Sequence, residues 1–217
     1  MDPYGYILKQ SVLSTSIVER CSDILDSVDF NEKMMSDEQV HENVFRAMDH
    51  PEQPIKQIQH VERFSEELRA LSVILPPLFG YETDTYEVAN MLVFIRHTGY
   101  KLLRPHQDGA YLGSDRFVTF WIPLNDVSPE NSCLHYLLGS HRLGLLNHEE
   151  TGTQTRNRTG AIGKSLDYMA FPLDQYTPLP MKMGDVVAHH PYTLHYSTVN
   201  QTDILRRALT LIIKLKN

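Results

Sequence analysis

The feature that most restricts the fold of this chain is a change in sequence pattern after Pro77. Downstream of it, short runs of β-branched and aromatic residues are separated by Gly, Pro, Asn and Asp. Such runs predict strands, and they read VANMLVFIRH, FVTFWIPL, CLHYLLG, DYMAFP, GDVVAHH, LHYSTVN and RALTLIIKL. About seven or eight short strands within about 130 residues favour a closed or two-layered antiparallel barrel, because that arrangement removes exposed sheet edges.

Before this change the pattern is helical. One apolar stripe runs through residues 14–28, and Ser16 with Glu19 supplies a capping box at its start. A second helix is predicted from Pro54 to Leu75, where apolar residues recur every three or four positions until two prolines end it. Helices followed by strands indicate an α+β fold, here mainly β, with N-terminal helices packed on one face of the barrel.

The length of 217 residues suits one domain with a substantial core and hardly leaves room for two. We therefore expect a single domain over residues 1–217, with a helical part at about 1–78 and a barrel core at about 89–215. The polar segment between Arg142 and Pro180 is rich in Thr and Gly and is predicted to be a mobile loop.

Charge and cysteine content argue against several classes of protein. The net charge is −7 and no Lys/Arg cluster appears, which disfavours a nucleic-acid partner. Cys21 and Cys133 lie far apart without CxxC spacing, so they indicate neither a disulfide framework nor a cysteine metal site. Neither a signal-peptide pattern nor an apolar run long enough to span a membrane is present, so we expect a soluble, cytoplasmic protein without a membrane partner.

Histidine followed two residues later by an acid is a possible metal-ligand spacing, and it occurs four times. The composition predicts about 1.4 such triplets by chance, so the spacing alone is weak. Residues two apart point to opposite sides of a helix, which argues against His60 and Glu62 in the predicted second helix. The triplets that begin at His50 and His148 lie in proline-flanked or polar segments and are interpreted as solvated surface.

His106 and Asp108 are different, because their segment is plausibly extended, and on a strand such residues share a face. Gly109 behind them permits close approach of another backbone. A second histidine from a neighbouring strand would complete two histidines and one carboxylate, a set that binds Fe(II) with open positions. Downstream the chain offers His189, His190 and His195, of which only His195 lies in a well-alternating run; the other two precede an expected turn at Pro191.

Several motifs in order carry a resemblance to a known family. They are HQD at 106–108, WIPLND at 121–126, PENSCLHYLLGSHRLG at 129–144, GDVV at 184–187, and HYSTVN at 195–200 followed by Arg206, Arg207 and Ala208. Together they resemble the phytanoyl-CoA dioxygenase (PhyH-like) family of Fe(II)- and 2-oxoglutarate-dependent oxygenases. The opening YGYILKQSVLS also resembles the first strand and helix of that family. This chain departs at Ser132 and Leu138, where the family usually has Gly and Pro.

The resemblance implies a double-stranded β-helix, also called a jelly roll or cupin-like barrel. It implies His106, Asp108 and His195 as iron ligands, and Arg206, helped by Ser197, as the anchor of the distal carboxylate of 2-oxoglutarate. Arg207 is the alternative anchor, but strand alternation puts the two arginines on opposite faces and the family spacing favours Arg206. Thr119 and Trp121 share one strand face and could line the cofactor pocket, although a core position is the favoured interpretation of Trp121.

The activity that the resemblance implies is oxidation of a small organic molecule by O2, coupled to decarboxylation of 2-oxoglutarate to succinate and CO2. Hydroxylation is favoured, because an Ala or Gly in place of Asp108 would open a halide site as in related halogenases. Two alternatives remain open: a non-redox metal-dependent isomerase or hydrolase of the cupin type, and an inactive binding module. Arg96, Tyr100 and Lys101 precede the metal strand; they are interpretable as surface residues, or as pocket residues that hold a carboxylate or phosphate.

Overall fold

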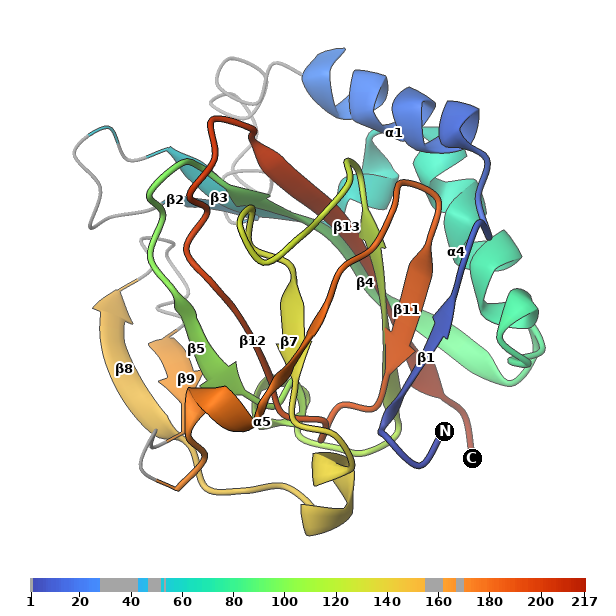
Figure 1. Cartoon of the computed structure of the whole chain (residues 1–217). Coiled ribbons are helices and arrows are strands. Elements are labelled where there is room, and N and C mark those ends of the chain that lie inside the picture. The colour runs from blue at the N-terminus through green and yellow to red at the C-terminus, as the bar shows by residue number, and fades with distance from the viewer. Residues whose placement is uncertain (1, 28–42, 47–51, 53, 155–161, 167–169) are drawn as a thin grey trace.

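Two antiparallel sheets face each other in the structure, a computed structural model that describes residues 2–27, 43–46, 52, 54–154, 162–166 and 170–217 (Figure 1). The larger sheet has seven strands in the order β1 (Tyr6–Lys9), β11 (Val186–His189), β6 (Phe117–Pro123), β13 (Arg206–Leu215), β4 (Tyr86–Arg96), β3 (Ile55–Gln59) and β2 (Val44–Arg46). The smaller sheet has four, in the order β10 (Thr177–Leu179), β7 (Leu134–Tyr136), β12 (His195–Ser197) and β5 (Leu103–His106). This is the expected α+β, mainly β, double-stranded β-helix, and the prediction is confirmed.

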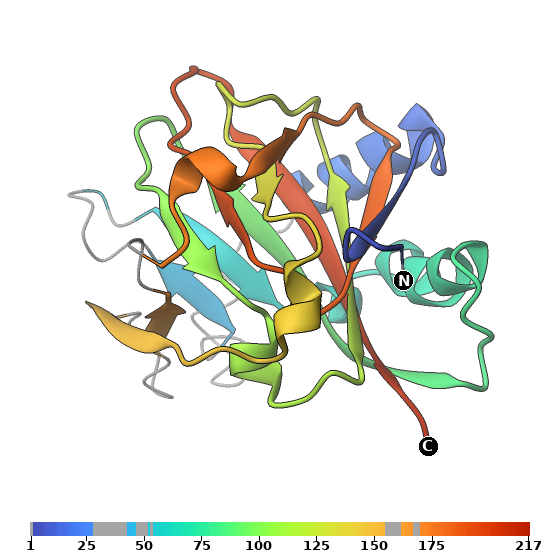
Figure 2. The same ribbon diagram turned by 60° about the horizontal axis from the view of Figure 1, so that its bottom comes forward.

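Alternation along the central strands of the larger sheet separates an apolar outer face from an inner face that carries both apolar and polar side chains. Outward side chains of β4, β6, β11 and β13 form one core with the helices α1 (Thr15–Ser27) and α4 (Glu66–Leu78). Both helices lie on the same side of this sheet in the two views (Figures 1 and 2). Burial of apolar surface from two helices on one sheet face is the main term that stabilises this layer.

The inner face of the larger sheet opposes the smaller sheet, and a second core lies between them. It contains Trp121, Val187 and Ala208 from the larger sheet and Leu134 and Tyr136 from the smaller. Buried polar side chains share this inner space, among them Thr119, His189, Arg206 and Thr210. A buried polar group needs a partner, so a barrel interior of this kind is where a site is expected.

The first predicted helix is confirmed, apart from its cap. α1 begins at Thr15, and the Ser14 hydroxyl accepts the Ile17 N–H at 3.4 Å. Ser16 therefore lies inside the first turn and does not form the predicted capping box with Glu19.

The second predicted helix, from Pro54 to Leu75, is wrong in its first half. That segment forms strand β3, then a short 3-10 helix (Val61–Arg63), and only then α4. α4 begins after Ser65, whose hydroxyl accepts the Leu68 N–H at 2.9 Å. The spacing of Ile55, Ile58 and Val61 that suggested a helix comes from one strand and the turn after it.

The two prolines do not end α4 where the sequence predicted, because both lie inside its last turn. Pro76 has no N–H to donate to the carbonyl of Ser72, four residues earlier. The Tyr86 hydroxyl from β4 donates to that carbonyl instead, at 3.0 Å. A side chain from the sheet thus satisfies the acceptor, and the helix continues to Leu78.

The segment between Arg142 and Pro180 was predicted to be a loop, and its described part is more ordered than that. It follows a 3-10 helix (Ser140–Leu143) and contains the two-stranded hairpin of β8 (Glu149–Gln154) and β9 (Ile162–Ser165), a second 3-10 helix (Leu173–Gln175) and β10. DYMAFP was predicted to be a strand, but residues 170–172 form none and residues 167–169 lie outside the described residues. Across the described chain, no helix combines the length and the apolar character that crossing a membrane requires.

Candidate metal centre

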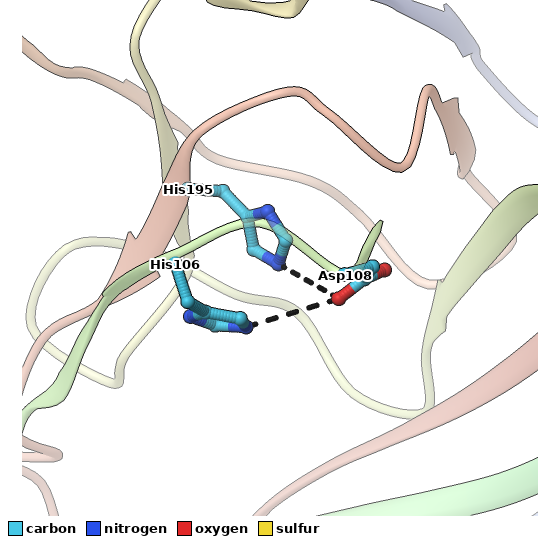
Figure 3. Close-up of side chains that lie close together, drawn as sticks. All are labelled: His106, Asp108 and His195. Atoms are coloured by element: carbon cyan, nitrogen blue, oxygen red, sulfur yellow. Dashed lines mark ion pairs between the residues drawn. The ribbon is translucent and has the colours of Figure 1, made fainter. Parts of the chain in front are cut away.

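His106 and His195 come from neighbouring strands of the smaller sheet and face each other in register. His106 is the last residue of β5 and His195 the first of β12, and the two pair directly in the ladder. Their rings lie 4.4 Å apart, centroid to centroid. Asp108 follows two residues after His106 and points back toward both rings (Figure 3).

Asp108 reaches this position by a turn and not by strand alternation, so the sequence argument for it was wrong in its geometry. β5 ends at His106, and Asp108 has helical backbone angles at the N-cap of the one-turn helix α5 (Gly109–Leu112). The Gly109 N–H donates to the Pro191 carbonyl at 2.8 Å, and a Cβ on Gly109 would meet the Tyr192 ring at 2.5 Å. The predicted close backbone approach at Gly109 is confirmed, and it fixes the turn that carries Asp108.

The three side chains present one ligand atom each to a common point. Asp108 Oδ1 lies 3.8 Å from His106 Nε2 and 3.6 Å from His195 Nε2. All three atoms lie within 4.8 Å of one another. Metal–ligand bonds of about 2.0–2.2 Å place two ligand atoms of one ion at most about 4.4 Å apart, so the two measured distances fit a single ion.

Hydrogen bonds set the tautomer that each histidine needs as a ligand. His106 Nδ1 lies 2.8 Å from the Arg104 carbonyl and His195 Nδ1 2.9 Å from the Thr193 carbonyl. A carbonyl only accepts, so Nδ1 carries the hydrogen and Nε2 keeps its lone pair toward Asp108. Burial lowers the pKa of His106, and burial together with neighbouring His106 lowers the pKa of His195 to about 3, which keeps both rings neutral.

The other oxygen of Asp108 is held by two donors from the larger sheet. The Thr119 hydroxyl of β6 donates to Oδ2 at 2.7 Å, and His189 Nε2 of β11 lies 3.0 Å from the same atom. Burial favours the neutral acid, but the hydrogen bond from His189 and the nearby histidines outweigh it and hold the pKa of Asp108 well below its usual range. The carboxylate therefore stays charged, with Oδ1 left for the common point.

His189 is a residue whose part in the site the sequence did not reveal. Its Nδ1 lies 2.9 Å from the Tyr136 hydroxyl on β7, so this ring links Tyr136 to Asp108. Because both ring nitrogens are in hydrogen bonds, His189 is not placed as a fourth ligand. The sequence predicted only that His189 ends a strand. Its role depends on the pairing of β11 with β6, and no local sequence pattern predicts that pairing.

Arg206 points into the barrel and Arg207 points out of it, as the alternation of β13 predicted. Arg206 is 2% exposed, its guanidinium carbon lies 5.6 Å from the centre of the Trp121 ring, and its Nη2 lies 3.4 Å from the Ser132 hydroxyl. Arg207 instead forms an ion pair with Asp26 of α1. Ser132 adopts a φ of 74°, in the left-handed region that glycine favours.

Trp121 and Ser197 are both buried in the same interior. Trp121 belongs to the core between the sheets, next to Arg206, and Ser197 accepts a hydrogen bond from Arg96 Nη2 at 3.3 Å. Thr119 contacts Asp108. Apart from Arg207, the site residues predicted from the sequence thus share one interior, which extends from His106 and His195 to Arg96 and Arg206.

The remaining His-x-acid triplets lie elsewhere. His60 and Glu62 do contact each other, with Nδ1 and Oε1 3.3 Å apart, because they lie in a turn and a 3-10 helix; the predicted opposite orientation is wrong. His148 Nε2 accepts the Gln107 N–H at 3.0 Å and is half-buried, not fully solvated. In the triplet that begins at His50, both His50 and Pro51 lie outside the described residues.

The chain matches the family described as phytanoyl-CoA dioxygenase (PhyH) over residues 1–208. This chain belongs to the phytanoyl-CoA dioxygenase family. The resemblance drawn from its motifs is therefore confirmed.

The chain is similar at low identity to a curated relative and to solved structures of the same fold. Phytanoyl-CoA dioxygenase domain-containing protein 1 of Mus musculus is 27% identical over 79% of this chain and 53% of its own length. EvdO2 from Micromonospora carbonacea var. aurantiaca, solved in complex with 2-oxoglutarate, has a TM-score of 0.70 and 21% identity, covering 99% of this chain and 87% of EvdO2. EctD from S. alaskensis with bound Fe has a TM-score of 0.72 and 14% identity, covering 99% and 74%. The chain spans about half the length, or less, of the curated relatives it matches.

Proposed function

We propose that this chain is an Fe(II)- and 2-oxoglutarate-dependent oxygenase that oxidises a small organic molecule. The observation that carries the proposal is the convergence of two neutral imidazole nitrogens and one carboxylate oxygen, with a buried arginine deeper in the same barrel. Two histidines and a carboxylate suit Fe(II) and leave positions open for further ligands. The structures of EvdO2 with 2-oxoglutarate and EctD with Fe, which share the fold, support the same choice of cofactors.

In this proposal His106, Asp108 and His195 hold the iron. The bound iron, with 2-oxoglutarate and O2, supplies oxidative decarboxylation of the keto acid to succinate and CO2 coupled to oxidation of the substrate. The chain contributes position and electrostatics. The hydrogen bonds that the histidine Nδ1 atoms donate to the Arg104 and Thr193 carbonyls fix the rings, and Thr119 with His189 fixes the carboxylate.

Arg206 is proposed to hold the distal carboxylate of 2-oxoglutarate. A guanidinium can pair with a carboxylate through two parallel hydrogen bonds, and these bonds are stronger in a dry pocket. Arg206 is buried, its Nε has no hydrogen-bond partner among the residues that the structure describes, and Trp121 covers one side of it. Arg207 cannot replace it, because its guanidinium is outside the barrel with Asp26 and Ser22.

Hydroxylation is the outcome that we propose for the substrate. Asp108 occupies the carboxylate position, with Oδ2 held by Thr119 and His189 and Oδ1 facing the metal position, so the chain has no free coordination position there for a halide. This distinguishes it from an enzyme with Ala or Gly at that position. The substrate class proposed is a small molecule.

The test begins without oxygen. Anaerobic addition of Fe(II) and 2-oxoglutarate should produce a weak visible charge-transfer band, and admission of O2 should then yield succinate. His106→Ala and His195→Ala should lose both signals, whereas His135→Gln, a buried histidine on β7 outside the centre, should keep them. Retention of succinate formation in either alanine variant would refute the ligand assignment. A metal-binding protein without the band would instead be a non-redox enzyme, and a band without succinate would indicate a binding module.

A further inference from the structure

A second buried arginine lies directly opposite Arg206. Arg96, the last residue of β4, pairs in register with Arg206 on β13. Paired residues of adjacent strands point to the same face, which for both is the barrel interior, and they are 6% and 2% exposed. The interior of the barrel thus contains two neighbouring guanidinium groups.

Neither guanidinium has a carboxylate partner among the residues that the structure describes. The described ion pairs involve other residues, and the Nε of Arg206 is buried without any hydrogen-bond partner. Burial lowers the pKa of Arg96 to about 10, and burial together with the charge of Arg96 lowers the pKa of Arg206. A guanidinium is not deprotonated in proteins, so both arginines carry a positive charge. Like charges directly opposite on paired strands are destabilising, so an anion between or beside the two guanidinium groups would stabilise the pair.

Arg96 is already held in place before any anion binds. Its Nη1 donates to the Lys101 carbonyl at 3.1 Å, and its guanidinium carbon lies 4.9 Å from the centre of the Tyr100 ring. Its Nη2 donates to the Ser197 hydroxyl at 3.3 Å. Because Ser197 accepts from Arg96, its own hydrogen is directed away from that arginine and is free to be donated to an acceptor in the pocket.

We propose that Arg96 and Arg206 form a two-arginine site for one carboxylate, the distal carboxylate of 2-oxoglutarate, in which Arg96 acts through its charge and by orienting the Ser197 hydroxyl. This inference rests on the proposed function. It assigns to β4 a residue that selects a keto acid with a second carboxylate over one without it. Arg96 is a positioning residue here, since it acts partly through Ser197.

Binding of two keto acids to protein loaded with Co(II), which does not turn over, separates this role from the metal site. 2-Oxoglutarate and 2-oxovalerate present the same chelating end, but 2-oxovalerate has a methyl group where 2-oxoglutarate has its distal carboxylate. The ratio of their dissociation constants, measured by calorimetry, therefore reports only on the distal carboxylate. Wild type should prefer 2-oxoglutarate, and Arg96→Gln should reduce this preference by about tenfold to a hundredfold while 2-oxovalerate binds unchanged.

Two further variants complete the experiment. Arg207→Gln is the matched control, because this arginine is next to Arg206 on the same strand but outside the barrel, and it should keep the wild-type ratio. Arg96→Lys keeps a charge and loses the paired geometry, so its ratio should fall between those of wild type and Arg96→Gln. If Arg96→Gln does not fold, a several-fold loss in Arg96→Lys supports the inference and a wild-type ratio overturns it.

The outcomes separate this inference from the proposed function. If Arg206→Gln loses the preference for 2-oxoglutarate over 2-oxovalerate while Arg96→Gln keeps the wild-type ratio of dissociation constants, the two-arginine site is overturned. The oxygenase proposal then stays intact. A wild-type protein that binds both keto acids equally, or neither, contradicts the proposed cosubstrate and with it the two-arginine site.

Discussion

The two carboxylate oxygens of Asp108 have different partners, and this difference decides how the residue can bind a metal. Oδ2 accepts from Thr119 and His189, while Oδ1 faces the two histidine nitrogens. A carboxylate held in this way offers one oxygen in a fixed direction. Partners behind the ligands commonly change metal affinity by about tenfold to a hundredfold.

We therefore predict that His189→Phe lowers Co(II) affinity by about tenfold or more, because Asp108 loses one of its two donors. His189→Gln, whose amide can still donate, should lose less. Calorimetric titration of the metal-free protein measures this, with His135→Phe as the control because that histidine bonds to the Cys133 carbonyl and not to the site. Equal affinity in wild type and His189→Phe would show that Thr119 alone positions the carboxylate.

Both cysteine thiols should be slow to react in the folded protein. Burial raises the pKa of Cys21 and of Cys133 to about 11. The thiolate is the reactive form, so at pH 8 only about one thiol in a thousand is ionised, and the fraction rises about tenfold per pH unit up to the pKa. Iodoacetamide labelling followed by mass spectrometry should show little modification at pH 8 and rapid modification in urea; fast labelling of native protein at pH 8 contradicts the prediction.

Among individual residues, the sequence predicted those site residues that lie within a recognisable local motif. His106, Asp108 and His195 belong to such motifs, and the structure brings them together. His189 was missed, because its importance comes from contacts with residues 53 and 81 positions away in the chain. Histidine spacing carries no information about a partner that the fold supplies.

At the scale of elements, the errors in the predicted secondary structure arise where several short elements in a row show the apolar spacing of one long helix. The segment from Ile55 to Leu75 has helical spacing throughout, yet a strand, a turn and a helix share it. The helix starts only at the Ser65 cap. The β-rich part was predicted better, because β4, β6, β11, β12 and β13 each have a run bounded by turn residues.

Gly184, just before β11, should tolerate no side chain. It has a φ of 95°, and a Cβ there would collide with the carbonyl oxygen of Leu13. Gly80 also has a positive φ, of 86°, but a Cβ there would meet nothing within 4 Å. Gly184→Ala should therefore cost about 1–3 kcal/mol more in the free energy of unfolding than Gly80→Ala. Urea unfolding of both variants measures the difference, and equal losses would show that the Leu13 segment moves aside.

At the scale of the whole molecule, the candidate centre connects both sheets. His106 and His195 belong to the smaller sheet, while Thr119 and His189, which hold Asp108, belong to the larger. Metal bound here should stabilise the barrel globally and not only a loop. A closed or two-layered antiparallel barrel was predictable from strand number and turn residues, and the jelly-roll type came from the family resemblance. Which strands lie next to each other was not predictable, since the ladder pairs elements far apart in sequence.

We predict that Co(II) at about a hundred times its dissociation constant raises the melting temperature by about 5–10 °C. The estimate follows from about 2.7 kcal/mol of binding free energy at that excess, and from about 2–4 °C per kcal/mol for a chain of this size. Differential scanning calorimetry with and without EDTA measures it. His195→Ala should melt at the same temperature with and without Co(II), and a shift that persists in this variant would place the stabilising ion elsewhere.

The adjacent arginines of β13 also bear on how the register of this strand is determined. Sliding it by one position would still place a guanidinium in the interior, so the positive charge alone does not discriminate between the two alignments. The slipped alignment would, however, turn Leu209, Leu211 and Ile213 away from the helices. The register of β13 is thus fixed by apolar packing on the helix-covered side of the sheet. The positions of the polar side chains in the interior depend on residues that do not contact them.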